Sequence, residues 1–221
     1  MDYWKEDTDC CSWDGVTCDD MGKGHVTGLH LQWNGLNGTI PSNSTLFLLP
    51  YLQVLDLSHN PLLKGSLPEA NWSNPLHMLD VSYTNFSGRL PDSIGNLKSL
   101  TRLDLRHCKF IGLVPANSLG NLTRLRYLDL SVNNFTGNIL SSISNLHNLS
   151  LLNLSINNFT GNIPLSLSNL HNLSWLDLSV NNFIGEIPEN LTQKEMDGDD
   201  GGVDGTKDSI ARTCRKEYDD A

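Results

Sequence analysis

The sequence lacks several features that mark common classes of protein. No run of about 18 apolar residues occurs in its 221 residues, so we expect no helical membrane span in this chain. The opening residues, MDYWKEDTD, lack the basic and apolar stretches of a secretory signal peptide. Basic residues are scarce, with 15 Lys and Arg against 25 Asp and Glu and a net charge of −10. This acidity disfavours nucleic acid and anionic membrane surfaces as partners.

Motifs for catalysis and metal binding are also missing. The seven His residues are dispersed, and no nucleophile elbow, phosphate loop or His/Cys cluster with metal-ligand spacing occurs. The stretch DGDDGGVDG faintly resembles a calcium loop, but Gly201 and Asp208 stand at its fifth and twelfth ligand positions. We therefore expect no enzymatic activity, no metal and no cofactor.

What the sequence does contain is a repeat. Seven copies of the pattern L-x-L followed by Asn, Phe, Gly and often Pro recur at intervals of 24 to 26 residues, which predicts a solenoid. In each copy the two leucines alternate with polar residues, as in a strand with one buried and one exposed face. Strands from successive repeats should stack in parallel. The first leucines are Leu29, Leu55, Leu79, Leu103, Leu128, Leu152 and Leu176.

A column of mostly Asn residues follows each strand. Here the backbone loses its ladder partners, so an inward amide can satisfy backbone groups along the solenoid. Cys108 stands in this column, and we interpret it as a buried substitute for Asn; a catalytic thiol is the alternative. The column comprises Asn34, Asn60, Thr84, Cys108, Asn133, Asn157 and Asn181.

Two residues further on, a Phe column is predicted to stack and fill the interior. It comprises Phe86, Phe110, Phe135, Phe159 and Phe183. Gly follows, then a β-branched residue or Leu, and then usually Pro; Ile139-Leu140 breaks this rule. The Pro positions predict a short exposed extended edge that needs no full ladder of hydrogen bonds.

Two motifs together carry a family resemblance. The ending N-x-F-x-G-x-I-P joined to S-x-x-N-L-x-x-L resembles the plant-specific leucine-rich repeat, and the opening DCCSWDGVTCD resembles the N-terminal cap of plant receptor-like proteins, receptor kinases and polygalacturonase-inhibiting proteins. The resemblance covers about residues 3–192. It implies an α/β-type repeat solenoid, a right-handed superhelix with a parallel concave β-sheet of about seven repeats, in an extracellular recognition protein.

The resemblance also implies three segments and a disulfide. We expect a remnant of the cap over residues 1–24, the solenoid over 25–192, and an acidic disordered tail over 193–221. In the family cap, Cys11 would pair with Cys18, leaving Cys10 without its usual partner, while Trp4 and Trp13 shield the first turn. Parts of the family pattern are missing at both ends, so we interpret the chain as a truncated product.

The concave face is the expected binding surface. Neighbouring strands lie about 4.8 Å apart, so seven strands span roughly 29 Å, enough for about eight residues of an extended peptide. An Asp column that includes Asp80, Asp104 and Asp129 is expected to line this face as an electronegative stripe that attracts cations. Aromatic and guanidinium groups gather on the first five turns. The candidate ligand-binding residues are Trp33, His59, Tyr83, Arg102, Arg106, His107, Arg126 and Tyr127.

Eleven Asn-x-Ser/Thr sequons favour a secretory route, although an Asn-, Leu- and Ser-rich repeat generates sequons by composition alone. Asn153 lies on the face of a strand, where a glycan would block the sixth turn, so either it is unmodified or ligands bind elsewhere. The predicted glycosylation sites are Asn37, Asn43, Asn71, Asn85, Asn121, Asn134, Asn148, Asn158, Asn172 and Asn190.

These features predict a non-catalytic module of a plant cell-surface receptor-like protein. It would bind a peptide, protein or glycan ligand in defence or development, and would signal through a membrane co-receptor that carries a kinase. An extracellular or plasma-membrane location is expected for the parent protein. A secreted inhibitor of pathogen polygalacturonase and a non-functional truncated product are the alternatives.

Overall fold

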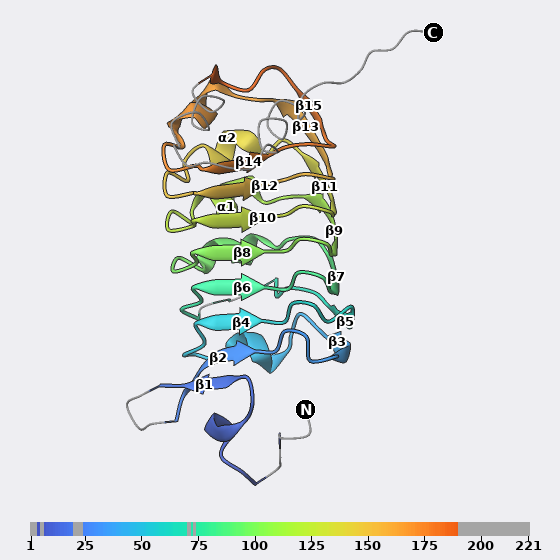
Figure 1. The fold of residues 1–221 in the computed structure, drawn as a ribbon, viewed down its shortest axis with the longest axis vertical. Coiled ribbons are helices and arrows are strands. Elements are labelled where there is room, and N and C mark those ends of the chain that lie inside the picture. The colour runs from blue at the N-terminus through green and yellow to red at the C-terminus, as the bar shows by residue number, and fades with distance from the viewer. Residues whose placement is uncertain (1–3, 5–6, 20–23, 70–71, 73, 190–221) are drawn as a thin grey trace, which may run out of the picture.

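The chain winds into coils that stack along one axis. The computed structural model describes residues 4, 7–19, 24–69, 72 and 74–189, and the tail predicted over 193–221, Cys214, Asn71 and Asn190 lie outside them. Figure 1 shows the strands of one sheet stacked from the N-terminal end upward, short helices behind them and a second set of strands along one edge. The predicted repeat solenoid with a parallel sheet is confirmed.

The leucines of successive coils set the register of an eight-stranded sheet. Its order is β1-β2-β4-β6-β8-β10-β12-β14, with β1 antiparallel to β2 and every later pair parallel. Leu55 pairs with Leu79, and Leu79 pairs with Leu103, so each leucine side chain enters the interior at the same level of its coil. The strands are β1 (Val16–Cys18), β2 (Val26–His30), β4 (Val54–Asp56), β6 (Met78–Asp80), β8 (Arg102–Asp104), β10 (Tyr127–Asp129), β12 (Leu151–Asn153) and β14 (Trp175–Asp177).

A second sheet of seven strands lies just before the Pro positions and was not predicted, while the Pro residues themselves lie outside its strands. It forms because Phe points inward and its neighbours point outward, the alternation of a strand, and each segment pairs in parallel with the next coil. Gly137 and Gly161 have positive φ values of 83° and 101°, which let the chain leave these strands without steric conflict. The strands are β3 (Asn37–Ile40), β5 (Leu62–Gly65), β7 (Asn85–Gly88), β9 (Lys109–Leu113), β11 (Asn134–Gly137), β13 (Asn158–Asn162) and β15 (Asn182–Ile184).

Short helical turns return the chain to the first sheet. Pro91, Pro115 and Pro164 directly precede three of them, where a residue without an N–H fits the start of a helix. Coils also approach closely here: a Cβ on Gly95 would lie 2.8 Å from the carbonyl oxygen of Ser118, which explains the glycine. The turns are η1 (Cys10–Ser12), η2 (Thr45–Leu48), η3 (Asp92–Asn96), α1 (Ala116–Gly120), α2 (Leu140–Ile143) and η4 (Leu165–Asn169).

The interior between the two sheets is a continuous apolar core. Leu79, Leu103, Leu128 and Leu152 are fully buried. The predicted Phe column is confirmed, because the rings of Phe110, Phe135, Phe159 and Phe183 stack at centroid distances of 5.9 to 6.0 Å. Since each ring packs against rings above and below it, no coil has a complete core of its own.

The start of the described chain covers the first coil as the resemblance implies. The Cys11–Cys18 disulfide is present and ties η1 to β1, which pairs with β2 at the edge of the sheet. The rings of Trp4 and Trp13 stack 5.0 Å apart, and Trp4 packs partly against the core. Cys10 is a free, half-buried thiol.

Candidate functional site

The Asn column holds neighbouring coils together after each strand ends. The Nδ2 of Asn157 donates to the carbonyl oxygens of Leu130, Leu154 and Ser155, and its Oδ1 accepts from the N–H of Phe135 in the preceding coil. Asn60, Asn133 and Asn181 repeat this arrangement. The predicted inward amide ladder is therefore present, and it rigidifies the border of the eight-stranded face.

Cys108 takes the place of Asn in this ladder. Its Sγ donates to the carbonyl oxygen of Val81 at 3.1 Å and lies 3.5 Å from the Oγ1 of Thr84. Burial raises the pKa of the Cys108 thiol to about 11, so at neutral pH almost none of the reactive thiolate forms. This geometry supports the structural interpretation of Cys108 over a catalytic thiol.

Replacing Cys108 with Asn should restore the ladder. The amide can donate to Val81 as the thiol does and can also donate to the carbonyl oxygen of Arg106, now 3.7 Å from the sulfur. We expect the Cys108→Asn variant to be more stable than Cys108→Ala by about 1 kcal/mol, measured by urea unfolding. An Asn variant less stable than the Ala variant would contradict the assignment.

Four ring side chains form a continuous stack along the first four coils. Ring centroids lie 3.9 Å apart for Trp33–His59, 4.6 Å for His59–Tyr83 and 4.8 Å for Tyr83–His107, with interplanar angles of 10° to 19°. The repeat pattern predicts these residues on the exposed face of the strands, but they lie just beyond the strand ends. All four have positive φ values of 53° to 60°, and the equivalent Val132, with φ 53°, shows that the fold imposes this turn. We call this group the aromatic stack.

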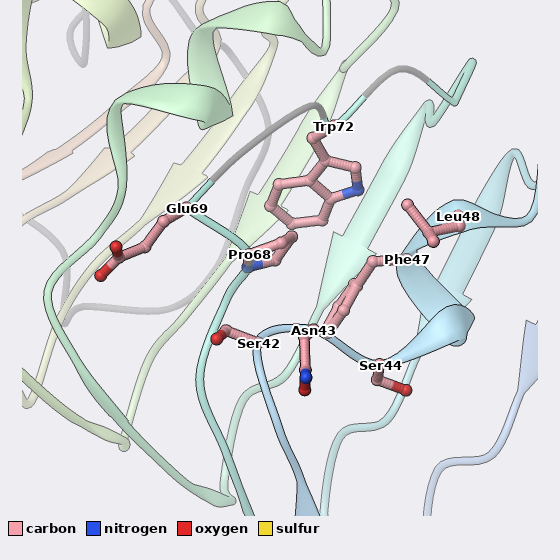
Figure 2. A pocket seen from close by; sticks show the side chains of 8 residues that line it. All are labelled: Ser42, Asn43, Ser44, Phe47, Leu48, Pro68, Glu69 and Trp72. Atoms are coloured by element: carbon pink, nitrogen blue, oxygen red, sulfur yellow. The ribbon is translucent and has the colours of Figure 1, made fainter.

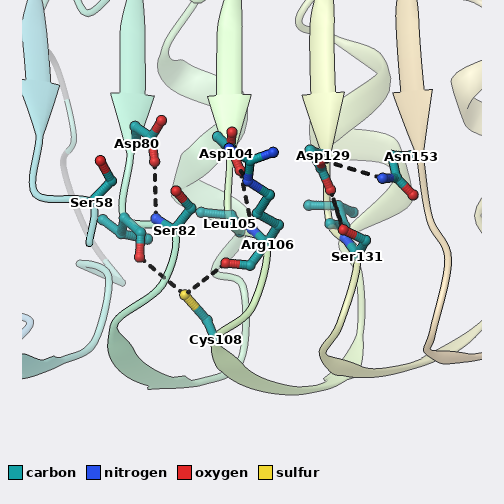
Figure 3. A network of polar contacts seen from close by, with 12 residues as sticks. Ser58, Asp80, Ser82, Asp104, Leu105, Arg106, Cys108, Asp129, Ser131 and Asn153 are labelled. Carbon is teal, nitrogen blue, oxygen red and sulfur yellow. Dashed lines mark hydrogen bonds and ion pairs between the residues drawn. The ribbon is translucent and has the colours of Figure 1, made fainter. Parts of the chain in front are cut away.

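The centre of the Asp column is buried, which corrects the prediction of an exposed electronegative stripe. Asp80, Asp104 and Asp129 are 5%, 0% and 2% exposed. The Oδ1 of Asp129 accepts from both the N–H and the hydroxyl of Ser131, and Asp80 accepts from the N–H of Ser82 (Figure 3). The alternation rule places these carboxylates on the outer face, but neighbouring side chains cover them.

Burial and like charges dominate the electrostatics of this column. Desolvation, followed by repulsion from Asp80 and Asp129, raises the pKa of Asp104 to about 7, although Arg106 opposes the shift. Desolvation also raises the pKa of Asp80 above its usual value. The Asp104 carboxyl therefore keeps its proton to a higher pH than an exposed carboxylate does, which weakens the predicted attraction for cations.

Arg102, Arg106 and Tyr127 form the cover over Asp104. An Arg102 Nη donates to the Oδ2 of Asp104 at 2.8 Å, and its guanidinium lies 3.6 Å above the Tyr127 ring. The Arg106 Nε is 3.7 Å from the Oδ1 of Asp104, and its guanidinium lies 5.4 Å from the Tyr83 ring. Both Arg side chains keep about a third of their surface exposed. The structure thus joins these residues to the aromatic stack as one patch.

Arg126 also lies on the side of the eight-stranded sheet, but it is less closely connected to the patch formed by the aromatic stack, Arg102, Arg106 and Tyr127. Its side chain is exposed, while its carbonyl oxygen accepts from the N–H groups of Ser150 and Leu151 in the next coil. It lies in the turn before β10, one residue before Tyr127.

Two hollows were not anticipated from the sequence. One of about 300 Å³ lies beside the aromatic stack and is lined in part by Tyr83, His107 and Lys109. Another, of about 350 Å³, lies beside η2 (Figure 2). There Phe47 and Trp72 pack edge to face at 5.4 Å, and none of the candidate ligand-binding residues lines the hollow. Only the first hollow extends the candidate site.

The later coils present a different surface. Val132 and Ile156 continue the line of the aromatic stack, and Val180 ends it. Ile156 is 48% exposed, Val180 68% and Trp175 43%. The face therefore changes from aromatic and basic in the early coils to apolar in the late ones, a gradient that the sequence analysis missed.

The predicted glycosylation sites fall mostly outside this patch. Asn85 is half-buried, and its Nδ2 donates to the carbonyl oxygen of Pro61. Asn153 is also half-buried, and its Oδ1 accepts from the N–H and hydroxyl of Ser155, which favours the first of its two alternatives, an unmodified side chain. The exposed sites are Asn37, Asn43, Asn121, Asn134, Asn148, Asn158 and Asn172.

The described residues contain one group with metal-ligand geometry. The sulfur atoms of Cys10, Cys11 and Cys18 lie within 4.8 Å of one another, but two of them form the disulfide and offer no thiolate. Among all the residues that the structure describes, no helix has both the length and the apolar character needed to cross a bilayer.

Comparison with known proteins decides the family. The model described as Leucine Rich Repeat matches residues 51–73, 75–97, 99–122, 124–146 and 172–193, just over half of the chain. The chain belongs to the leucine-rich-repeat family. A model described as Leucine rich repeat N-terminal domain matches residues 2–19 of this leucine-rich-repeat chain, the segment that carries the disulfide.

Relatives of this leucine-rich-repeat chain include plant receptor-like proteins and receptor kinases. Receptor-like protein 49 of Arabidopsis thaliana is 48% identical over 136 residues, 62% of this chain and 14% of that protein. The LRR ectodomain of the membrane receptor kinase GASSHO1/SCHENGEN3 from Arabidopsis thaliana, in complex with CASPARIAN STRIP INTEGRITY FACTOR 2, superposes with a TM-score of 0.76 at 34% identity, covering 84% of this chain and 22% of that one.

A third similar structure contains two partners. The Arabidopsis receptor kinase HAESA, in complex with the peptide hormone IDA and the co-receptor SERK1, superposes with a TM-score of 0.64 at 27% identity. That match covers 86% of this chain and 39% of the HAESA chain. The present chain thus covers less than two fifths of each of these three proteins.

Proposed function

We propose that this chain is a ligand-recognition module of a plant cell-surface receptor-like protein, and that its ligand binds the eight-stranded face over the first five coils. The observation that carries the proposal is the aromatic stack together with Arg102, Arg106 and Tyr127. The core does not require rings at these positions, because Val132 and Val180 adopt the same backbone conformation. Trp, Tyr and Arg are the residue types enriched in binding hot spots.

A peptide or protein ligand fits this face better than a small molecule. The patch crosses several coils, and neighbouring parallel strands lie about 4.8 Å apart. The hollow beside Tyr83 and His107 holds about 300 Å³, room for one side chain of a larger ligand. The peptide hormone named for the HAESA complex supports this class of ligand. The proposal also includes a glycan as a ligand and a role in defence or developmental signalling.

Signalling would pass through a second protein. The coils provide a binding surface, and we assign no catalytic role to them. The co-receptor named for the HAESA complex supports a membrane co-receptor with a kinase as that partner. The disulfide and the exposed sequons suit an extracellular or plasma-membrane location for the parent protein.

The test is selection of binders from a random twelve-residue peptide library displayed on phage. We expect the wild-type protein to enrich peptides, and the Trp33→Ala/Tyr83→Ala double variant to bind them about tenfold or more weakly. A matched control is Leu62→Ala/Ile184→Ala, which removes exposed side chains of the seven-stranded sheet. No enrichment, or an equal loss in the control, would overturn the proposal.

An inhibition assay covers the alternative function. Stoichiometric inhibition of fungal polygalacturonases by the purified chain would favour the enzyme-inhibitor function over receptor recognition.

A further inference from the structure

The exposed charge on the early coils is opposite in sign to that of the whole chain, which carries −10. Asp80, Asp104 and Asp129 are at most 5% exposed and cannot meet a partner. Asp56 is half-buried, with its Oδ1 accepting from the N–H and hydroxyl of Ser58. The carboxylates of the column are therefore occupied within the fold.

Cations, by contrast, remain accessible. Lys109 and Arg126 are exposed, and Arg102 and Arg106 keep about a third of their side-chain surface in solvent. Within the described residues, Asp104 is the one acceptor hydrogen-bonded by the Arg102 guanidinium. A guanidinium has five N–H donors; the Nε of Arg102 is buried without a partner in the part of the chain that the structure describes, so an outside acceptor can reach Arg102 through its Nη groups.

The aromatic stack, like the accessible cations, favours a negatively charged partner. The faces of His59 and Tyr83 are covered by the neighbouring rings at 3.9 to 4.8 Å, so a ligand meets ring edges and not faces. Ring edges carry the positive end of the aromatic quadrupole, and those of Trp, His and Tyr also carry N–H and O–H groups. Cations and sugar rings bind aromatic faces, and the two inner rings, His59 and Tyr83, have none free; Trp33 ends the stack and is 73% exposed. Carboxylates and carbonyl oxygens suit the edges.

We propose that the segment docking on the first five coils is an acidic peptide, continued by apolar residues over the later coils. This inference rests on the proposed function and specifies the ligand of that same face. The apolar continuation follows from Ile156, Trp175 and Val180, which are 48%, 43% and 68% exposed. A polyuronate has the carboxylates but no apolar side chains for this half, so a peptide is the better fit.

The test uses the peptides selected from the phage library and two charge variants of each. We expect Asp and Glu to be enriched in the half of the peptide that contacts the early coils. Replacing those residues with Asn and Gln should weaken binding about tenfold or more, and replacing them with Lys should abolish it. The Lys109→Gln/Arg126→Gln variant should lose affinity for the acidic peptide, and the loss should shrink as salt is raised.

Two further measurements complete the test. Arg124→Gln/Lys98→Gln removes two exposed cations outside the candidate patch and should leave affinity unchanged. A decamer of galacturonic acid is the competing anionic probe. Selected peptides that are basic or neutral, or a decamer that binds more tightly than the acidic peptide, would overturn this inference while leaving the recognition function intact. Failure to select any peptide would instead count against the proposed function.

Discussion

The Phe135→Ala variant is expected to unfold with a free energy about 3 to 5 kcal/mol lower than that of the wild type. Phe135 is fully buried, and its ring stacks between Phe110 at 5.9 Å and Phe159 at 6.0 Å. Truncation removes apolar contacts on both sides and leaves a cavity that the rigid coil backbones cannot close. Urea unfolding followed by circular dichroism measures the change.

Phe183 provides the matched control for this prediction. It stacks on Phe159 at 6.0 Å but is only half-buried, so Phe183→Ala should destabilise the fold clearly less than Phe135→Ala. Equal losses from the two substitutions, or a loss below about 1 kcal/mol for Phe135, would contradict a continuous core that links the coils.

The second large effect concerns pH. Burial raises the pKa of Asp104 from 3.8 to about 7, so the folded state holds a proton that the unfolded state releases near pH 4. The contribution of Asp104 to stability is therefore largest below about pH 4, falls as pH rises, and levels off above about pH 7. Between these limits, the stability of the wild type relative to Asp104→Asn should fall by an amount on the order of 2 to 4 kcal/mol.

Urea unfolding of both proteins at several pH values from 3 to 8 measures this difference. The comparison isolates Asp104 because all other titratable groups are common to the two proteins. Two stability curves that run parallel across the range would show that the carboxyl ionises alike in the folded and unfolded states. That result would contradict the burial of Asp104 beneath Arg102 and Tyr127.

The sequence predicted the features that the repeat period controls. The spacing of the leucines predicts the register in which Leu79 pairs with Leu103, and the column that contains Phe135 predicts its stack. The role of Cys108 as a buried substitute for Asn could be predicted because its position in the repeat defines its partners. The Cys11–Cys18 disulfide followed from the family resemblance and not from the residues alone.

Features that depend on contacts between coils were harder to predict. Alternation along β8 places Asp104 outward, and the neighbouring Arg102, Arg106 and Tyr127 side chains bury it. The stack through Tyr83 depends on a positive φ that sequence alternation does not indicate. A signal for the second sheet was present, since Phe135 alternates with outward residues, but the following Gly and Pro positions suggested only a short extended edge without a full ladder of hydrogen bonds.

Hydroxyl-radical footprinting of the protein with and without a selected phage peptide tests the central claim most directly. If the eight-stranded face of the first five coils is the binding surface, the peptide should protect Trp33, Tyr83, His107 and Tyr127 from oxidation. Leu62 and Ile184, which are exposed on the seven-stranded sheet, should react equally in both samples. Protection of Leu62 and Ile184 with unchanged reactivity of the aromatic stack would contradict the account.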